Sequence, residues 1–462
     1  MTKNSKKGFS LVINDIKGLT RPESRPFLRM LYTVALPIIF QELINALVNI
    51  LDSLMIGSLS LFSINAVGFA NELFFLFGLL LFGVNSAASI FMGQLWGKND
   101  AKGIRKILGL STIISVTGSM IFVAIALFIP EQFINLYNKE PEVARLGAEY
   151  LRIVAPTYVI TAFVTAIGSA LRCMRQTKIP VFATVAALLT NFLLNLLFIF
   201  GFGWGVAGAA LATVIARLVQ TVVLLMAIVR LRLPLLGPLK DFRGHTKASV
   251  KEYFILAFPV MVNEMVWAIG QTMYNIAYRF YDAEAQGAVR IASTIYNIFT
   301  VASVGIGAAC GIIVANALGA GELDEAKELA RKCLVILLIV AILTSSGLIL
   351  VIPLILGIYN VPQQTIDYAH ILLCITAVSA IVKTYNYTTI VGILRSGGDT
   401  KYCLMLDMVS VWLVGVPAVF LSVYVFKWPI YISFSLVMLE EVYKIILSTR
   451  RVIGCKWVKC LV

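Results

Sequence analysis

Long apolar runs separated by short polar segments dominate the sequence. An α-helix needs about 20 mainly apolar residues to cross the hydrocarbon core of a bilayer. Twelve runs have this length, and they cover roughly residues 30–56, 64–93, 105–129, 147–171, 179–201, 206–230, 252–278, 286–317, 330–356, 366–392, 402–426 and 429–449. The pattern therefore predicts an all-α polytopic membrane protein with twelve transmembrane helices.

The second half of the chain repeats the first. With a shift of 222 residues, Pro37 aligns with Pro259 and Glu42 with Glu264. One residue of slip later, the segment LRCMRQTK, which begins at Leu171, aligns with LRSGGDTK. A nearly constant offset over more than about a hundred residues indicates duplication. Because each copy holds an even number of spans, the copies are parallel repeats related by an axis along the membrane normal.

The duplication predicts two six-helix lobes that flank a central cavity and are related by pseudo-twofold symmetry. The predicted parts are an N-lobe at 30–229, a C-lobe at 251–449, a cytoplasmic linker at 230–250, and cytoplasmic segments at 1–29 and 450–462.

Charge and composition agree with a membrane protein. Charged residues make up 13% of the chain and hydrophobic residues 59%, whereas a soluble domain carries roughly 25% charge. The net charge of +14 could indicate nucleic-acid binding, but the basic residues lie mainly on one side of the predicted spans. The loops on the other side hold only Lys139, Arg145, Arg152, Arg279, Arg290 and Lys427. This asymmetry follows the positive-inside rule, so we expect cytoplasmic termini and no nucleic-acid partner.

Other targeting and redox signals are weak. Residues 1–30 lack a compact apolar core followed by a small-residue cleavage site, so we expect no cleavable signal peptide. The seven cysteines form no CxxC pair and there are two histidines, so we expect neither a disulfide framework nor a metal site.

The first span carries four polar side chains on one face. At about 100° per residue, Glu42, Asn45, Asn49 and Asp52 lie at roughly 0°, 300°, 340° and 280°. A charge at the bilayer centre costs at least ~2.5–3.5 kcal/mol, so this stripe should face protein or a wet cavity. We interpret Asp52 and Glu42 as cation-coupling residues, and Asn45 and Asn49 as part of a substrate cavity.

The seventh span has a similar stripe. Its members share one helical face and are Glu264, Trp267, Gln271, Tyr274 and Tyr278. We assign them, together with Lys383 of the tenth span, to the substrate cavity; plain aromatic packing is the alternative for the three aromatic residues. Opposite charges within spans tend to pair, so we predict a Glu264–Lys383 ion pair.

The fifth and sixth spans add uncharged polar groups. Asn191 and Asn195 are four residues apart and thus neighbours on one helix face, and Thr213 follows in the next span. Their amides and hydroxyl suit a neighbouring carboxyl or a small cation, although helix–helix contact is an equal alternative. We interpret Arg217 as a structural partner.

Glu72 and Asp407 lie near the ends of predicted spans, and we treat Glu440 and Glu441, in the span 429–449, in the same way. We interpret them as solvated groups at the membrane interface.

The ordered motifs resemble the multidrug and toxic compound extrusion (MATE) family. They are P-x14-D-x-x-M-x-G from Pro37, Q-x-x-G from Gln94, the twice-used LR-x4-TK, and NFLLNLLFIFG followed by GVAGAALAT. The resemblance covers nearly the whole chain. It implies secondary active efflux of organic, often cationic, compounds, driven by H⁺ or Na⁺.

The resemblance also assigns residues. In bacterial branches the acid at the position of Asp52 couples transport to a cation, and in one branch it is surrounded by residues matching Asn191, Asn195 and Thr213. That branch commonly has Asp where this chain has Asn195. Another branch uses acids in the seventh and tenth spans. This chain has an acid, Glu264, in the seventh span but a lysine, Lys383, in the tenth. H⁺ and Na⁺, the latter bound at Asp52, therefore both stay open.

The sequence thus predicts a monomeric antiporter of the bacterial cytoplasmic membrane that exchanges small organic substrates for H⁺ or Na⁺. No P-loop pattern is present and no cofactor is implied, so an ATP-driven pump is disfavoured. The alternatives are a flippase for lipid-linked sugars, which would need several cationic cavity residues, and a membrane-embedded transferase, which would need clustered catalytic acids or histidines.

Overall fold

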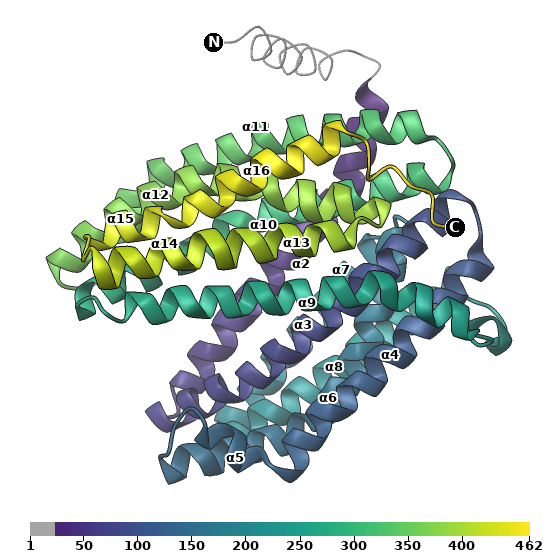
Figure 1. Cartoon of the computed structure of the whole chain (residues 1–462). Helices are drawn as coiled ribbons and strands as arrows, with labels where there is room; N and C mark the ends of the chain where they lie inside the picture. The colour runs from purple at the N-terminus through teal and green to yellow at the C-terminus, as the bar shows by residue number, and fades with distance from the viewer. Residues whose placement is uncertain (1–23, 360) are drawn as a thin grey trace, which may run out of the picture. The chain divides into compact units, whose positions relative to one another are not determined.

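The computed structural model describes residues 24–359 and 361–462, except for the side chains of residues 49, 50, 53 and 54. Every regular element in these residues is a helix (Figure 1). The α-helices are α2 (Arg25–Gly57), α3 (Leu61–Gly97), α4 (Ala101–Phe128), α5 (Pro130–Asn135), α6 (Pro141–Cys173), α7 (Lys178–Asn195), α8 (Gly205–Arg230), α9 (Lys247–Tyr278), α10 (Ala283–Gly319), α11 (Leu323–Leu356), α12 (Gln363–Tyr387), α13 (Thr400–Val409), α14 (Val416–Phe420), α15 (Ile430–Ser435) and α16 (Val437–Ile453).

Shorter 3₁₀ and π turns extend or join these helices. They are η2 (Leu196–Gly201), η3 (Leu239–Phe242), η4 (Thr388–Leu394), η5 (Arg395–Gly397), η6 (Ser410–Gly415) and η7 (Leu421–Val425). The π turns η2 and η4 continue α7 and α12, so each of these pairs forms one span.

The structure confirms the prediction of an all-α polytopic membrane protein. Within the described residues, eleven helical segments are long and apolar enough to cross a membrane. The twelfth predicted span, 429–449, is divided at Leu436 into α15 and α16. The buried charged residues Glu440, Glu441 and Lys444 lie in its second part, and they lower the apolarity of that helix.

The helices form two compact units that exchange helix halves. One unit is Phe40–Met261; the other contains the chain up to Ile39 together with Val262–Val462. Both boundaries fall inside a long helix, two residues after Pro37 in α2 and after Pro259 in α9. The predicted lobes follow the sequence repeat. In the structure, the first half of α9 belongs to the unit Phe40–Met261, and the first half of α2 belongs to the other unit.

Packing inside each unit shows this exchange. Phe27, Leu31 and Val34, from the first half of α2, belong to the same buried cluster as Cys310 and Cys333. In the unit Phe40–Met261, the Tyr253 hydroxyl of α9 donates a hydrogen bond to the Val84 carbonyl of α3 at 2.6 Å. The two halves of α2, and likewise the two halves of α9, therefore belong to different compact units.

A buried ion pair fixes the segment between α8 and α9 to α4. The Arg105 guanidinium lies 2.8 Å from the Asp241 carboxylate, and it also donates to the Pro234 carbonyl at 2.7 Å. One turn further along α4, Gly109 lies so close to the Phe242 carbonyl that an added Cβ would collide with it. The close approach requires a residue without a side chain.

We therefore expect Gly109→Ala to reduce the free energy of unfolding by about 1–3 kcal/mol, because α4 and η3 must separate to admit the methyl group. Thermal unfolding in detergent would measure this. The control is Gly78→Ala in α3, where an added Cβ meets nothing within 4 Å. This substitution should leave the free energy of unfolding unchanged or raise it slightly. Equal melting temperatures for the two variants would contradict the close contact.

Candidate functional site

Asp52 lies at the start of a chain of hydrogen bonds in the unit Phe40–Met261. Its Oδ1 accepts from Asn195 Nδ2 at 2.8 Å, and the same Nδ2 contacts Asn191 Oδ1 at 3.2 Å. Asn191 Nδ2 in turn donates to Thr213 Oγ1 at 3.4 Å. Helices α2, α7 and α8 thus bring together four of the five residues predicted to couple transport to a cation.

A hydrogen-bond donor and a positive charge act on Asp52. The amide nitrogen of Asn195 faces the carboxylate, while its buried Oδ1 has no partner among the described residues. Arg217 donates to Gln220 Oε1 at 2.9 Å, and its charge acts on Asp52. Sequence analysis treated Arg217 as a structural partner only. A cation within the same apolar lobe as Asp52 is the signal that could have identified it as a charge partner.

The other polar residues of α2 are placed differently. Glu42 is half-buried and does not join the Asp52 hydrogen bonds; its charge acts instead on the Arg172 guanidinium of α6. Asn45 is half-buried. The side chain of Asn49 lies outside the described residues. The shared helix face therefore holds two separate electrostatic environments.

The predicted Glu264–Lys383 ion pair is wrong in this structure. Glu264 Oε1 accepts from Arg395 Nη2 at 2.9 Å, and the side chains are 16% and 2% exposed. Lys383 instead lies over the Tyr296 ring, with Nζ 4.9 Å from its centroid. Arg395 aligns with Arg172 in the sequence repeat, as Glu264 does with Glu42, so the duplicated fold places an arginine near both glutamates.

The residues of α9 predicted to line the substrate cavity differ in exposure: some are exposed or half-buried, and others are buried. Trp267 is 42% exposed and Gln271 half-buried. Tyr274 and Tyr278 belong to a buried core cluster, and the Tyr274 hydroxyl donates to Glu440 Oε2. The two tyrosines thus pack inside their own unit, because α16 covers this end of the aromatic face.

Asp407, Glu440 and Glu441 are not solvated interfacial groups. They are 7%, 1% and 7% exposed. Lys444 Nζ lies 3.0 Å from Asp407 Oδ1 and 3.6 Å from Glu440 Oε1, and Asn263 Nδ2 donates to Asp407 Oδ2 at 2.9 Å. The prediction that these acids are solvated at the membrane interface is wrong because α13 and α16 pack together, which the sequence pattern does not show. The spacing of Glu440 and Lys444, four residues apart on one helix face, was the available signal.

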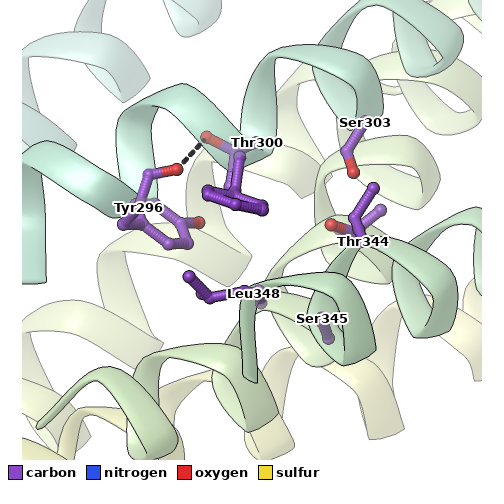
Figure 2. A pocket seen from close by; sticks show the side chains of 9 residues that line it. Tyr296, Thr300, Ser303, Thr344, Ser345 and Leu348 are labelled. Carbon is purple, nitrogen blue, oxygen red and sulfur yellow. Dashed lines mark hydrogen bonds between the residues drawn. The ribbon is translucent and has the colours of Figure 1, made fainter. Parts of the chain in front are cut away.

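A small cavity lies between α10, α11 and α12, and six of the nine residues that line it carry a hydroxyl, although most of its surface is apolar (Figure 2). The space open to a water centre is about 10 Å³, close to the room that one water molecule needs. In Figure 2, Ser303 of α10 and Thr344 of α11 point toward one another. The buried Ser345 hydroxyl has no partner among the described residues, which favours a bound water.

Comparison with known proteins identifies the family. The family model named MatE matches residues 37–197 and again residues 259–421. The chain belongs to the MatE family. The two matches begin at Pro37 and Pro259, so they confirm the internal repeat of this MatE protein.

Relatives and solved structures agree with this assignment. The chain is 22% identical over 461 residues to a probable multidrug resistance protein NorM of Thermotoga maritima, covering 98% of this chain and 97% of that protein. It is 27% identical to multidrug and toxin extrusion protein 1 of Oryctolagus cuniculus, over 87% of this chain and 70% of that one.

Among solved structures, the fold resembles a MATE crystal structure in the straight conformation, with a TM-score of 0.84, 18% identity and coverage of 92% and 96%. A transporter of the MOP superfamily from Pyrococcus furiosus gives a TM-score of 0.83 at 18% identity, with the same coverage. These likenesses establish the fold. Family membership makes the protein a multi-pass membrane transporter and argues against a membrane-embedded transferase.

Proposed function

We propose that this MatE transporter exports small organic compounds, cationic ones among them, in exchange for protons. The observation that carries the proposal is the Asp52 site, where a half-buried carboxylate is bound by Asn195 and lies within reach of the Arg217 charge. Intramembrane acids of this kind are functional candidates because their charge is costly to keep in a bilayer. The names of the relatives, multidrug resistance and multidrug and toxin extrusion, support the substrate class.

The donors around Asp52 favour a proton over Na⁺. A hard cation is held by several oxygen ligands, whereas a proton needs one base. Asn195 turns its NH₂ group, not its oxygen, toward the carboxylate, so the amide offers no oxygen ligand to Na⁺. A protonated Asp52 can instead donate to the Asn195 oxygen after the amide rotates, so this pair suits both protonation states.

Exchange follows from competition. If the proton and the substrate favour different arrangements of the transporter, and each excludes the other, movement of one drives the other. Inward movement of one unit charge contributes about 2.3 kcal/mol per 100 mV. We propose that the protein works as a monomer in the cytoplasmic membrane of a bacterium, with both termini in the cytoplasm.

We expect a pH gradient alone to drive efflux. Liposomes that contain the purified protein would be loaded with a fluorescent organic cation, and their membrane potential would be clamped. Release should follow an imposed pH gradient and should be absent under a Na⁺ gradient at equal pH on both sides. Release that requires Na⁺ and ignores the pH gradient would refute proton coupling. Movement of a lipid-linked oligosaccharide without cation release would favour the flippase alternative.

A further inference from the structure

The unit that contains Val262–Val462 holds a buried polar cluster that the proposed export cycle does not use. It consists of Asp407 on α13 and Glu440, Glu441 and Lys444 on α16. Lys444 contacts both Asp407 and Glu440, and Tyr274 donates to Glu440. At Gly415 an added Cβ would collide with the Tyr274 hydroxyl and the Glu440 carboxylate. The backbone of η6 thus leaves room for this contact.

Glu441 differs from the other two acids. Its Oε2 accepts from Asn386 Nδ2 of α12 at 2.7 Å, and no cation in the described part of the chain lies within ion-pair distance of it. Glu441 is 7% exposed and Asn386 is 3% exposed. An ionised carboxylate at this position has a neutral amide as its direct partner, and the Lys444 charge acts on it from beyond ion-pair distance. This compensates burial less well than a direct ion pair does.

The groups that face these acids come from every helix packed around them. Besides the acids themselves they are Asn263, Tyr274 and Tyr278 of α9, Tyr296 of α10, Lys383 and Asn386 of α12, Arg395 of η5, Cys403 of α13, and Lys444 of α16. The Arg395 guanidinium is paired with Glu264 and adds no net charge, so the remaining groups are three carboxylates and two ammonium groups. One bound proton makes the cluster neutral, and Glu441 is the acid that no ammonium contacts directly.

The amide groups indicate a place for that proton. Asn263 and Asn386 each donate Nδ2 to a carboxylate, to Asp407 and Glu441 respectively, while their buried Oδ1 atoms have no partner among the described residues. Asn195 stands in the same relation to Asp52. An asparagine beside a carboxyl can donate to the ionised form and accept from the protonated form.

A second observation in the cluster points to a missing small hydrogen-bonding group. The Tyr278 hydroxyl is buried, has no hydrogen-bond partner among the described residues, and interacts electrostatically with Glu440. Tyr296, which interacts electrostatically with Glu441, also lines the small cavity of Figure 2. A water in that cavity would bring proton-conducting groups to the edge of the cluster.

We propose that Glu441, with Asn386, Glu440, Lys444 and Asp407, forms a second proton-exchange site. A proton from water forms an O–H bond with a Glu441 carboxylate oxygen, and the same bond breaks when the proton returns to water at another stage of the cycle. The inference rests on the proposed function only in its claim that this proton takes part in transport. Proton binding itself needs no substrate.

Infrared difference spectroscopy of the full-length protein at a series of pH values tests the site without any transport. A protonated buried carboxylic acid gives a carbonyl-stretch band that an ionised one lacks. We expect Glu441→Gln to remove one titrating band that Asp52→Asn retains. The matched control is Asp367→Asn, an exposed carboxylate on α12 that accepts from Gln363; it should leave both bands in place.

Asn386→Leu keeps the proposal testable if Glu441→Gln fails to fold. It removes the amide but no titratable group, so the Glu441 band should persist at a shifted frequency. A spectrum that Glu441→Gln and Asn386→Leu both leave unchanged would overturn the proposal.

Transport provides the separate readout. In the pH-driven liposome assay, Glu441→Gln should lower the number of protons moved per substrate, whereas failure of the export proposal would abolish substrate movement and leave the infrared band intact.

Discussion

The Asp52→Asn variant is expected to lose ion-driven export, falling to the level of protein-free vesicles, while it folds normally. Asparagine has nearly the shape of aspartate, and it can still form a hydrogen bond with Asn195 after one amide rotates. It cannot carry a charge or exchange a proton. Efflux of a fluorescent organic cation from liposomes under a pH gradient measures the loss, and thermal unfolding in detergent verifies the fold.

Glu72→Gln is the matched control for this experiment. Glu72 lies in the same unit, on α3, and is exposed. The substitution also replaces a carboxylate by its amide, so it should retain wild-type export. Wild-type rates in Asp52→Asn at normal expression would remove Asp52 from the coupling mechanism, whereas loss of export in both variants would indicate a general effect of removing charge.

The second large effect is expected at the buried pair Glu264–Arg395. Arg395→Met leaves the Glu264 carboxylate without its guanidinium, and Glu264→Gln leaves the guanidinium without its carboxylate. Removing one partner of a buried ion pair costs about 3–5 kcal/mol. Because the double variant leaves no unpaired charge, its loss should be smaller than the sum of the single losses. Unfolding in detergent of all four proteins completes the cycle.

The exposed pair Glu142–Arg145 on α6 supplies the control cycle. Its side chains are 45% and 62% exposed, and the charges lie 2.7 Å apart. Solvent screening makes such exposed pairs contribute little to stability, so Arg145→Met should alter stability little. Additive losses at Glu264 and Arg395 would show that the two side chains act independently in the folded protein.

Periodicity and repeats determined much of the fold at the sequence level. Apolar runs of span length define helices directly, because every backbone group in a bilayer must form its hydrogen bond within the span. The division of the last span at Leu436 was not predictable in this way. The sequence pattern also does not show that the buried charged residues of α16 have partners on α9, α12 and α13.

The candidate site was predictable where its residues come from sequence motifs. Asp52, Asn191, Asn195 and Thr213 were grouped from a resemblance in sequence, and the structure joins them by hydrogen bonds. Arg217 was interpreted only as a structural partner: a basic residue in the same lobe as Asp52 suggests a charge partner, but helix packing decides whether the two charges come close.

The sequence by itself determined that this chain is a duplicated, all-helical membrane protein with a carboxylate in its first span, since hydrophobicity and repetition are local properties. Only the tertiary structure decided which charges meet. Glu264 pairs with Arg395 and not with Lys383, and Lys444 joins Asp407 to Glu440. Long side chains on neighbouring helices have several partners in reach, and the choice depends on helix rotation and packing, which the order of residues along the chain does not specify.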